Sequence, residues 1–246
     1  SSDLWISAAE AIALVGARPV FVDIEPATFL LDRRLIEQAI TPRTKAIVPV
    51  SLFGQLPELE LINVIAERHG LAVIEDGAQS FGASRHGQKS CGMTTIGVTS
   101  FFPTKPLGCY GDGGALFTRD AALARKLRIL RGHGSEKRGE HVAVGLNGRL
   151  DTLQAAVLLA KLPQLEADLQ RRRSIAASYT QGLPEQLTAP LTLPGNEHVF
   201  GQYTIRVPGD RDAFAARLGQ AGIDSAVYYA KPLHLQPVFQ GLQSPA

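Results

Sequence analysis

Three short apolar, β-branched runs alternate with helix-like segments over the first 75 residues, and this rhythm constrains the fold most. The runs are 19–24 (PVFVDI), 45–50 (KAIVPV) and 71–74 (LAVI), and we expect helices over 33–40 and 57–70 between them. Strands that alternate with helices are typical of a parallel sheet, because each crossover must return to the same edge of the sheet. The sequence therefore predicts an α/β fold, with helices on both faces of a large, mostly parallel sheet.

Helix-start patterns occur at two further places. Ser7 and Glu10 have the spacing of a capping box, and Gly16 is placed to end that helix. Asp151 and Gln154 have the same spacing ahead of the apolar run LQAAVLLAKL, for which we expect a long buried helix that bends near Pro163.

The second half of the chain continues with shorter elements and then changes in character. Between residues 95 and 228 the pattern predicts strands over 95–101, 115–118, 203–207 and 225–228, and helices over 121–131 and 212–221. From about residue 183, loops that contain Pro and Gly become common. We therefore expect a large domain over 1–150, a long connecting helix over 151–182 and a smaller α+β domain over 183–246.

Composition excludes several classes of partner. The 25 basic and 23 acidic residues give a formal net charge of +2 and are spread along the chain, so no basic stripe points to a nucleic acid or a membrane surface. No apolar run approaches the roughly 18 residues that span a bilayer. Cys91 and Cys109 have no paired spacing, and no cluster has metal-ligand spacing, which indicates free thiols in a reducing cytoplasm and no metal site.

Two residues stand out once the strands are placed. Asp76 follows the run 71–74 at its carboxyl end, where open parallel sheets bind their ligands. Lys105 lies among Phe101, Phe102 and Leu107 in a Pro- and Gly-rich loop between two expected strands. Apolar neighbours disfavour an ammonium ion, so this lysine is prepared to react as a neutral amine in Schiff-base chemistry.

Five motifs together resemble the sugar aminotransferases of the DegT and StrS type, which have the fold-type I architecture of enzymes that depend on pyridoxal 5′-phosphate (PLP). They follow the family order over about residues 6–235. The motifs are VSLFGQ (50–55), IEDGAQSFGA (74–83), TSFFPTKPLGCYGDGGALFT (99–118), RGHG (131–134) and GLNGRLDTLQAAVLLAKL (145–162).

The resemblance implies roles for four residues at the cofactor. Lys105 is expected to carry PLP as a Schiff base and later to move a proton, and Asp76 to face the pyridine nitrogen. A carboxylate there keeps that nitrogen protonated, so the ring can accept electrons. Gln79 resembles the family residue beside the cofactor ring, and Ser100 resembles the hydroxyl donor to the cofactor phosphate.

The resemblance also implies a homodimer with shared sites. Asn147 resembles an asparagine that reaches the phosphate from the neighbouring subunit. Arg149 resembles an arginine that faces an acidic sugar nucleotide. An arginine suits that task because its planar fork pairs two oxygens at once. Tyr228 stands at a sugar-contact position where similar enzymes often have histidine. His234 is a candidate for the substrate pocket, and Trp5 for the aromatic group that stacks on the ring.

The activity expected from this resemblance is transamination of a keto sugar nucleotide with glutamate as amino donor. The closest resemblance is to bacterial enzymes that aminate a UDP-linked 3-oxo-N-acetylhexuronic acid for the O-antigen of lipopolysaccharide. A 4-keto nucleotide-sugar aminotransferase and a noncatalytic relic of the fold stay open as alternatives. Sugar dehydration is disfavoured, because those relatives replace the lysine by histidine. Compared with the family, the chain begins after a Gly-Thr-type phosphate-binding loop and stops short of the final helices.

Overall fold

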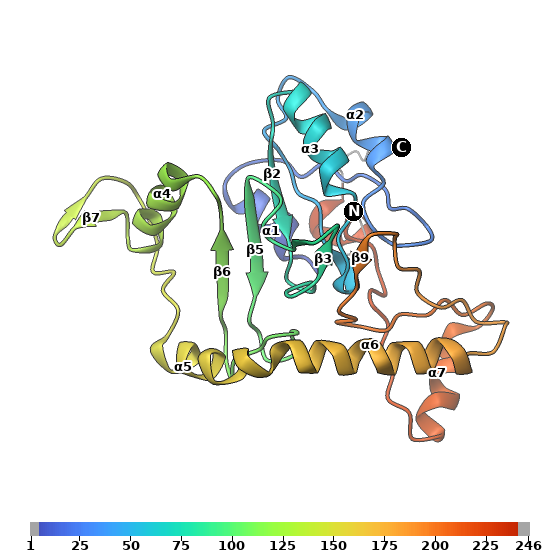
Figure 1. Cartoon of the computed structure of the whole chain (residues 1–246). Helices are drawn as coiled ribbons and strands as arrows, with labels where there is room; N and C mark the ends of the chain where they lie inside the picture. The colour runs from blue at the N-terminus through green and yellow to red at the C-terminus, as the bar shows by residue number, and fades with distance from the viewer. Residues whose placement is uncertain (1–4, 241–246) are drawn as a thin grey trace.

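A four-stranded sheet, in the order β1-β2-β5-β6, lies at the centre of the computed structural model, which describes residues 5–240 (Figure 1). Strand β2 (Ala72–Asp76) pairs in parallel with β1 (Ala46–Ile47) and with β5 (Ile96–Ser100). Strand β6 (Gly114–Phe117) pairs with β5 in the antiparallel sense. The sheet is therefore mixed and mostly parallel, as the sequence predicts.

Helices and short turns connect and cover these strands. The helices are α1 (Ser7–Leu14), α2 (Ile36–Ala39), α3 (Leu59–Arg68), α4 (Ala121–Arg131), α5 (Thr152–Lys161), α6 (Leu165–Gly182) and α7 (Arg211–Gln220). The 3₁₀ turns are η1 (Arg33–Leu35), η2 (Leu52–Gly54), η3 (Leu162–Gln164), η4 (Leu233–Leu235) and η5 (Pro237–Phe239). At Pro163 the α-helical pattern changes to the 3₁₀ turn η3, and α5 and α6 together form one long rod below the sheet (Figure 1).

Two smaller sheets lie outside the central one. Strand β3 (Ser84–Arg85) pairs with β4 (Gln88–Lys89) and with β9 (Asn196–Glu197), which comes from far along the chain. The side chain of Gln55 adds a second tie to the same distant segment, because it donates to the Leu191 carbonyl at 2.8 Å and accepts from Leu193 N–H at 2.9 Å. Strands β7 (Ser135–Lys137) and β8 (Glu140–His141) form a hairpin that projects with α4 from the body (Figure 1).

Three expected strands are absent, and this part of the prediction is wrong. Residues 19–24 run extended, with only Ile24 bridged to Leu31, and 203–207 has a single bridge from Arg206 to Thr188. Residues 225–228 form no strand. Each segment has strand-like composition but no partner strand within residues 5–240, and a strand needs a neighbour to bond with.

The expected helix starts are partly wrong as well. Helix α1 is preceded by Ile6 without a side-chain cap, although Gly16 ends it as expected with a φ of 74°. Asp151 does cap α5 by accepting from Leu153 N–H at 2.8 Å, but Gln154 bonds elsewhere. Helix α3 begins at Leu59 rather than at Pro57.

Helix α5 is less buried than the apolar run LQAAVLLAKL predicts. Leu158 is buried against Phe101, Leu107 and Cys109, but Leu153, Leu159 and Leu162 are 75%, 70% and 48% exposed. The chain described here covers only one side of this helix, so its burial within the chain is partial.

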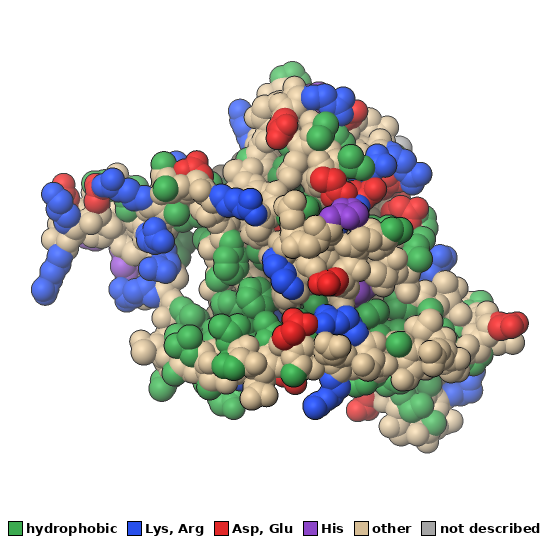
Figure 2. Space-filling view, in the orientation of Figure 1, with side chains coloured by type: hydrophobic (Ala, Val, Ile, Leu, Met, Phe, Trp, Pro, Cys, Tyr) green, Lys and Arg blue, Asp and Glu red, His purple; other side chains and the backbone are tan. Residues whose placement is uncertain are grey.

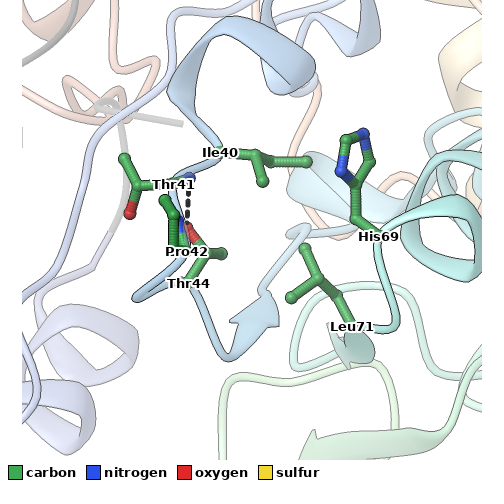
Figure 3. Close-up of a pocket in the computed structure, with 6 residues that line it drawn as sticks. All are labelled: Ile40, Thr41, Pro42, Thr44, His69 and Leu71. Atoms are coloured by element: carbon green, nitrogen blue, oxygen red, sulfur yellow. Dashed lines mark hydrogen bonds between the residues drawn. The ribbon is translucent and has the colours of Figure 1, made fainter.

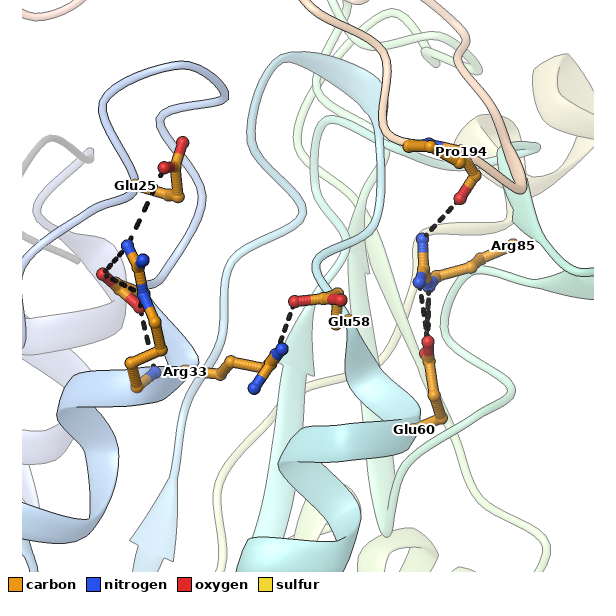
Figure 4. Close-up of polar contacts among 8 residues, drawn as sticks. Glu25, Arg33, Glu58, Glu60, Arg85 and Pro194 are labelled. Atoms are coloured by element: carbon orange, nitrogen blue, oxygen red, sulfur yellow. Dashed lines mark hydrogen bonds and ion pairs between the residues drawn. The ribbon is translucent and has the colours of Figure 1, made fainter.

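Buried Arg85 joins three elements of the fold (Figure 4). Its guanidinium donates to both carboxylate oxygens of Glu60 on α3, with the shortest contact at 2.6 Å, and to the Pro194 carbonyl at 3.0 Å. The ion pair between Arg33 and Glu58 beside it is more open, with side chains 39% and 35% exposed. The two pairs therefore offer a matched comparison of a pair with a buried arginine and a pair with a partly exposed one.

We expect Arg85→Ala to lower the free energy of unfolding by about 2 kcal/mol, because Pro194 loses its donor and Glu60 its buried partner. Arg33→Ala should cost less than about 1 kcal/mol. The Arg85 guanidinium lowers the pKa of Glu60 from its ordinary 4.5. The stabilisation is therefore present above pH 4.5 and is lost as the pH falls through the lowered pKa. Urea titrations at several pH values measure both effects, and equal costs for the two variants would contradict the prediction.

Candidate active site

Asp76 ends β2 at the carboxyl edge of the parallel strands, as the sequence predicts. Its backbone N–H donates to the Pro49 carbonyl and its carbonyl accepts from Ser51 N–H, both at 2.9 Å. Its Oδ1 accepts from Ala78 N–H at 3.0 Å. Backbone and carboxylate are both held, so the position of this partly buried acid is fixed by the strand and the turn after it.

Lys105 lies half-buried in the loop 102–112 between β5 and β6, and its N–H donates to the Phe102 carbonyl at 2.9 Å. Burial lowers the pKa of Lys105, while the negative charge of Asp76 opposes that change. Burial likewise raises the pKa of Asp76, opposed by the Ala78 hydrogen bond and by the charge of Lys105. The structure therefore brings the two residues together, in mutual electrostatic contact, at the edge where open α/β sheets bind ligands.

Gln79 links this pair to two distant segments. Its Oε1 accepts from Phe53 N–H at 2.6 Å, and its Nε2 donates to the Tyr229 hydroxyl at 3.0 Å. Burial raises the pKa of Tyr229, and the charge of Asp76 raises it further. Tyr229 thus belongs to the site, although the sequence pointed only to its exposed neighbour Tyr228, whose ring meets that of Tyr229 edge-on at 5.3 Å. The adjacent tyrosines were a signal, but sequence alone does not say which one turns inward.

Ser100 ends β5 at the same edge of the sheet, and its Oγ accepts from Phe102 N–H at 3.2 Å. For four other residues singled out in the sequence, the structure of residues 5–240 gives no contact with Asp76 or Lys105. Asn147 and Arg149 are exposed after the β7–β8 hairpin, and neither side chain forms a hydrogen bond or ion pair within residues 5–240. His234 lies with its ring 6.5 Å from that of Phe21, and Trp5 is exposed.

Glu75 is a fully buried acid that the sequence reading missed. Its carboxylate accepts from Ser51 Oγ at 2.8 Å, from Ser90 Oγ at 2.7 Å and from Cys91 N–H at 2.7 Å. Burial raises its pKa, although these donors favour the charged form. Successive strand residues face opposite sides of a sheet, so Glu75 binds the supporting loops behind β2 while Asp76 faces the site.

A pocket of about 340 Å³ lies at the other end of the same strands. Figure 3 shows its lining residues just before β1 and β2: Ile40, Thr41, Pro42, Thr44, His69 and Leu71. Asp76 and Lys105 lie at the carboxyl edge, so this pocket is separate from the site.

The exposed Leu153 and Leu159 of α5 and Leu162 of η3 belong to a wider apolar surface. Tyr110 and Leu116 are also exposed on the adjoining loop and strand β6. Figure 2 shows hydrophobic side chains gathered over α5 and the neighbouring sheet. Soluble monomers rarely expose large contiguous apolar patches, so this surface is suited to contact with another protein surface.

The sequence and the fold of the chain match those of known proteins. The model of the DegT/DnrJ/EryC1/StrS aminotransferase family matches residues 2–246. The chain belongs to this family. Within residues 5–240, no helix of this family member is long and apolar enough to cross a membrane, and no group of three or more His, Cys, Asp or Glu is placed to hold a metal ion.

Two curated relatives are named as aminotransferases of 3-oxidised UDP sugars. The chain is 50% identical over 234 residues to UDP-2-acetamido-2-deoxy-3-oxo-D-glucuronate aminotransferase of Pseudomonas aeruginosa, covering 95% of this chain and 65% of that protein. It is 47% identical to UDP-N-acetyl-3-dehydro-alpha-D-glucosamine 3-aminotransferase of Acidithiobacillus ferrooxidans, covering 96% and 64%. The chain therefore spans about two thirds of the length of the curated relatives that it matches.

Solved structures support the same fold. A family aminotransferase from Brucella abortus superimposes with a TM-score of 0.94 at 44% identity, over 98% of this chain and 66% of that one. A structure from Bacillus subtilis, described as having bound cofactor PMP, superimposes with a TM-score of 0.90 at 32% identity, over 98% and 58%. The predicted fold-type I architecture is thereby confirmed.

Proposed function

We propose that this family member transaminates a keto sugar nucleotide with PLP as cofactor and glutamate as amino donor. The observation that carries the proposal is the pair formed by Lys105 and Asp76 at the carboxyl edge of the sheet, in which burial lowers the pKa of the amine beside a fixed carboxylate. A lysine that loses its proton readily is a nucleophile for carbonyl carbon. The two 3-oxo-sugar aminotransferases described above support this class of reaction.

The residues present fit PLP. Asp76 offers a partly buried carboxylate to a protonated ring nitrogen, and Lys105 offers an amine to the cofactor aldehyde. Ser100 offers a hydroxyl at the same edge for the phosphate. Gln79 follows Asp76 by three positions, and its side-chain amide bonds to Phe53 N–H and to the Tyr229 hydroxyl. When bound, the cofactor supplies an electron sink for the electrons left when a proton departs.

Lys105 would also move that proton. Its lowered pKa lets the freed amine accept a proton from the substrate carbon and return it to another position. The nearby Asp76 charge limits how far the lysine pKa falls, so the amine can hold the proton between the two transfers.

We propose a UDP-linked 3-oxo-N-acetylhexuronic acid as substrate, on the way to a bacterial surface polysaccharide. Both curated relatives above carry a 3-oxo or 3-dehydro UDP sugar in their names, which supports the 3-position and UDP. An exposed arginine such as Arg149 is chemically suited to the sugar carboxylate. Assays with 3-keto and 4-keto nucleotide sugars would separate this substrate from the 4-keto alternative.

A second candidate is a noncatalytic protein. The chain is 49% identical to a protein of Geobacillus stearothermophilus named as a pleiotropic regulatory protein, over 97% of this chain and 65% of that one. Visible absorption by a bound lysine–PLP link would favour the enzyme, and a colourless protein that cannot be loaded with PLP would favour the regulator.

Borohydride trapping tests the proposed function directly. The protein is incubated with PLP, reduced with borohydride and digested, and the peptides are read by mass spectrometry. We expect one reduced cofactor adduct, on Lys105, because burial makes this amine reactive. An adduct on another lysine, or none, would overturn the assignment.

We further propose a homodimer that shares its active sites. Asn147 and Arg149 stand just before α5, whose outward leucines are exposed and whose N-terminus is fixed by the Asp151 cap. A rigid helix at an interface can project the preceding loop into a neighbouring subunit.

If sites are shared, Lys105→Ala and Asn147→Ala subunits should complement each other. We expect each variant alone to be nearly inactive, and a statistical mixture to regain about a quarter of wild-type activity, because half of the dimers hold one intact site of two. Activity after co-refolding measures this, and light scattering gives the mass. No recovery despite proven subunit exchange, or an active monomer, would contradict the prediction.

A further inference from the structure

One stripe of helix α5 faces the loop that carries Lys105. Gln154, Val157, Leu158 and Lys161 have the i, i+3, i+4, i+7 spacing that places them on the same side of a helix. Leu153, Leu159 and Leu162 lie off this stripe and are exposed. The helix therefore has an outward apolar face and an inward face that carries both polar and apolar side chains.

Two polar side chains of the inward face bond to the loop backbone. Gln154 Oε1 accepts from Tyr110 N–H at 2.9 Å, and Lys161 Nζ donates to the Gly108 carbonyl. The Lys161 ammonium also lies 6.0 Å from the centre of the Tyr110 ring, within reach of a cation–π contact. Residues 108–110 are thus held at both ends by α5.

These contacts affect the position of Lys105, because hydrogen bonds and backbone packing inside the loop connect residues 108–110 to the part that carries Lys105. Lys105 N–H donates to the Phe102 carbonyl and Cys109 N–H to the Phe101 carbonyl, at 2.9 and 2.8 Å. A side chain at Gly108 would lie only 2.6 Å from the Pro103 carbonyl oxygen, so the two limbs of the loop are packed backbone to backbone. A displacement at 108–110 therefore carries the Lys105 limb with it.

The loop needs external support on its outer side. Tyr110 is 80% exposed, so its ring buries little apolar surface there. Segments with few buried contacts and several glycines open readily. Leu107 and Cys109 anchor the inner side against Leu158, and the contacts of Gln154 and Lys161 add polar support to the Gly108–Tyr110 backbone on the outer side.

We propose that Gln154 and Lys161 are positioning residues, which hold the Lys105 amine in place relative to Asp76 through the backbone of Gly108 and Tyr110. The value of this placement for the reaction rests on the proposed function. The placement itself can be measured without cofactor.

The experiment compares matched pairs in the full chain. Gln154→Met and Lys161→Met keep side-chain length but lose the acceptor or the donor, while Gln154→Glu and Lys161→Arg keep them. First, the pH dependence of Lys105 acetylation is followed by mass spectrometry without PLP, with exposed Lys126 as internal reference. Second, the rate of PLP release is followed by absorbance in the loaded protein.

We expect both methionine variants to move the Lys105 titration midpoint upward, toward the ordinary lysine value of 10.5, because a loosened loop buries the amine less. PLP release should quicken about five- to tenfold, the change expected for loss of one hydrogen bond. The conservative variants should stay within about twofold of wild type.

Unchanged midpoints in both methionine variants would overturn the positioning role, as would conservative variants that behave like the methionine ones. If Gln154→Met fails to fold, Lys161→Met carries the test, because its side chain lies mostly outside the core. A wild-type protein that forms no adduct on Lys105 would refute the proposed function, while the acetylation profiles would still decide the placement.

Discussion

Replacing Lys105 with alanine should lower the rate of transamination by about 10³-fold or more, since both the amine nucleophile and the proton carrier are lost. Lys105→Arg should be equally slow, because it keeps the positive charge but cannot form the covalent link. Folding should be preserved in both variants, as the lysine side chain makes no hydrogen bond or ion pair within residues 5–240. Single-turnover assays with glutamate would measure the loss.

A chemical rescue sharpens this prediction. The Lys105→Ala variant leaves space for a small amine, so added methylamine should restore part of the proton transfer, whereas Lys105→Arg should not respond. Wild-type turnover in either variant would show that another residue performs the chemistry.

Replacing Asp76 with asparagine should slow transamination by about 10²- to 10³-fold while part of the PLP binding is kept. Asparagine is the matched change, because its side-chain oxygen can still accept from Ala78 N–H and so preserve the turn. Only the charge is removed, and with it the group that would keep the ring nitrogen protonated.

The same variant has a second readout in the protein without cofactor. Asp76 raises the pKa of Lys105 against the effect of burial, so Asp76→Asn should lower that pKa further. The midpoint for Lys105 acetylation should therefore shift to lower pH. Unchanged turnover together with an unchanged midpoint would remove Asp76 from the site.

Sequence predicted the parts of the site that depend on local pattern. Asp76 was singled out because strand ends can be read from hydrophobic runs, and Lys105 because its apolar loop is contiguous in sequence, whereas Ser100 was reached through the family motif. Gln79 was reached through the family motif, but its bond to Tyr229 spans 150 residues and leaves no local pattern. Glu75 was passed over because its bonding partners come from separate loops, which only the folded chain brings together.

The errors in the fold have the same physical origin. Residues 19–24 and 225–228 have strand composition, yet a strand is defined by its neighbour, and within residues 5–240 the first segment has a single bridge, from Ile24 to Leu31, and the second has none. Gln154 has the spacing of a capping box, but its side chain bonds to Tyr110 instead, because that backbone donor competes for the same oxygen. Local propensity is a weak guide wherever a tertiary partner is available.

The pairing of β3 with β9 has a consequence for how the protein is made. Ser84 and Glu197 face each other in that ladder and also bond through their side chains, although 113 residues separate them. A ribosome that adds about 5–20 residues per second needs roughly 6–23 s to supply the second strand after the first. Throughout that interval the edge of β3 is unpaired, and open strand edges attract other chains. We therefore expect this edge of the nascent chain to be open to wrong pairing while α4, α5 and α6 are being synthesised.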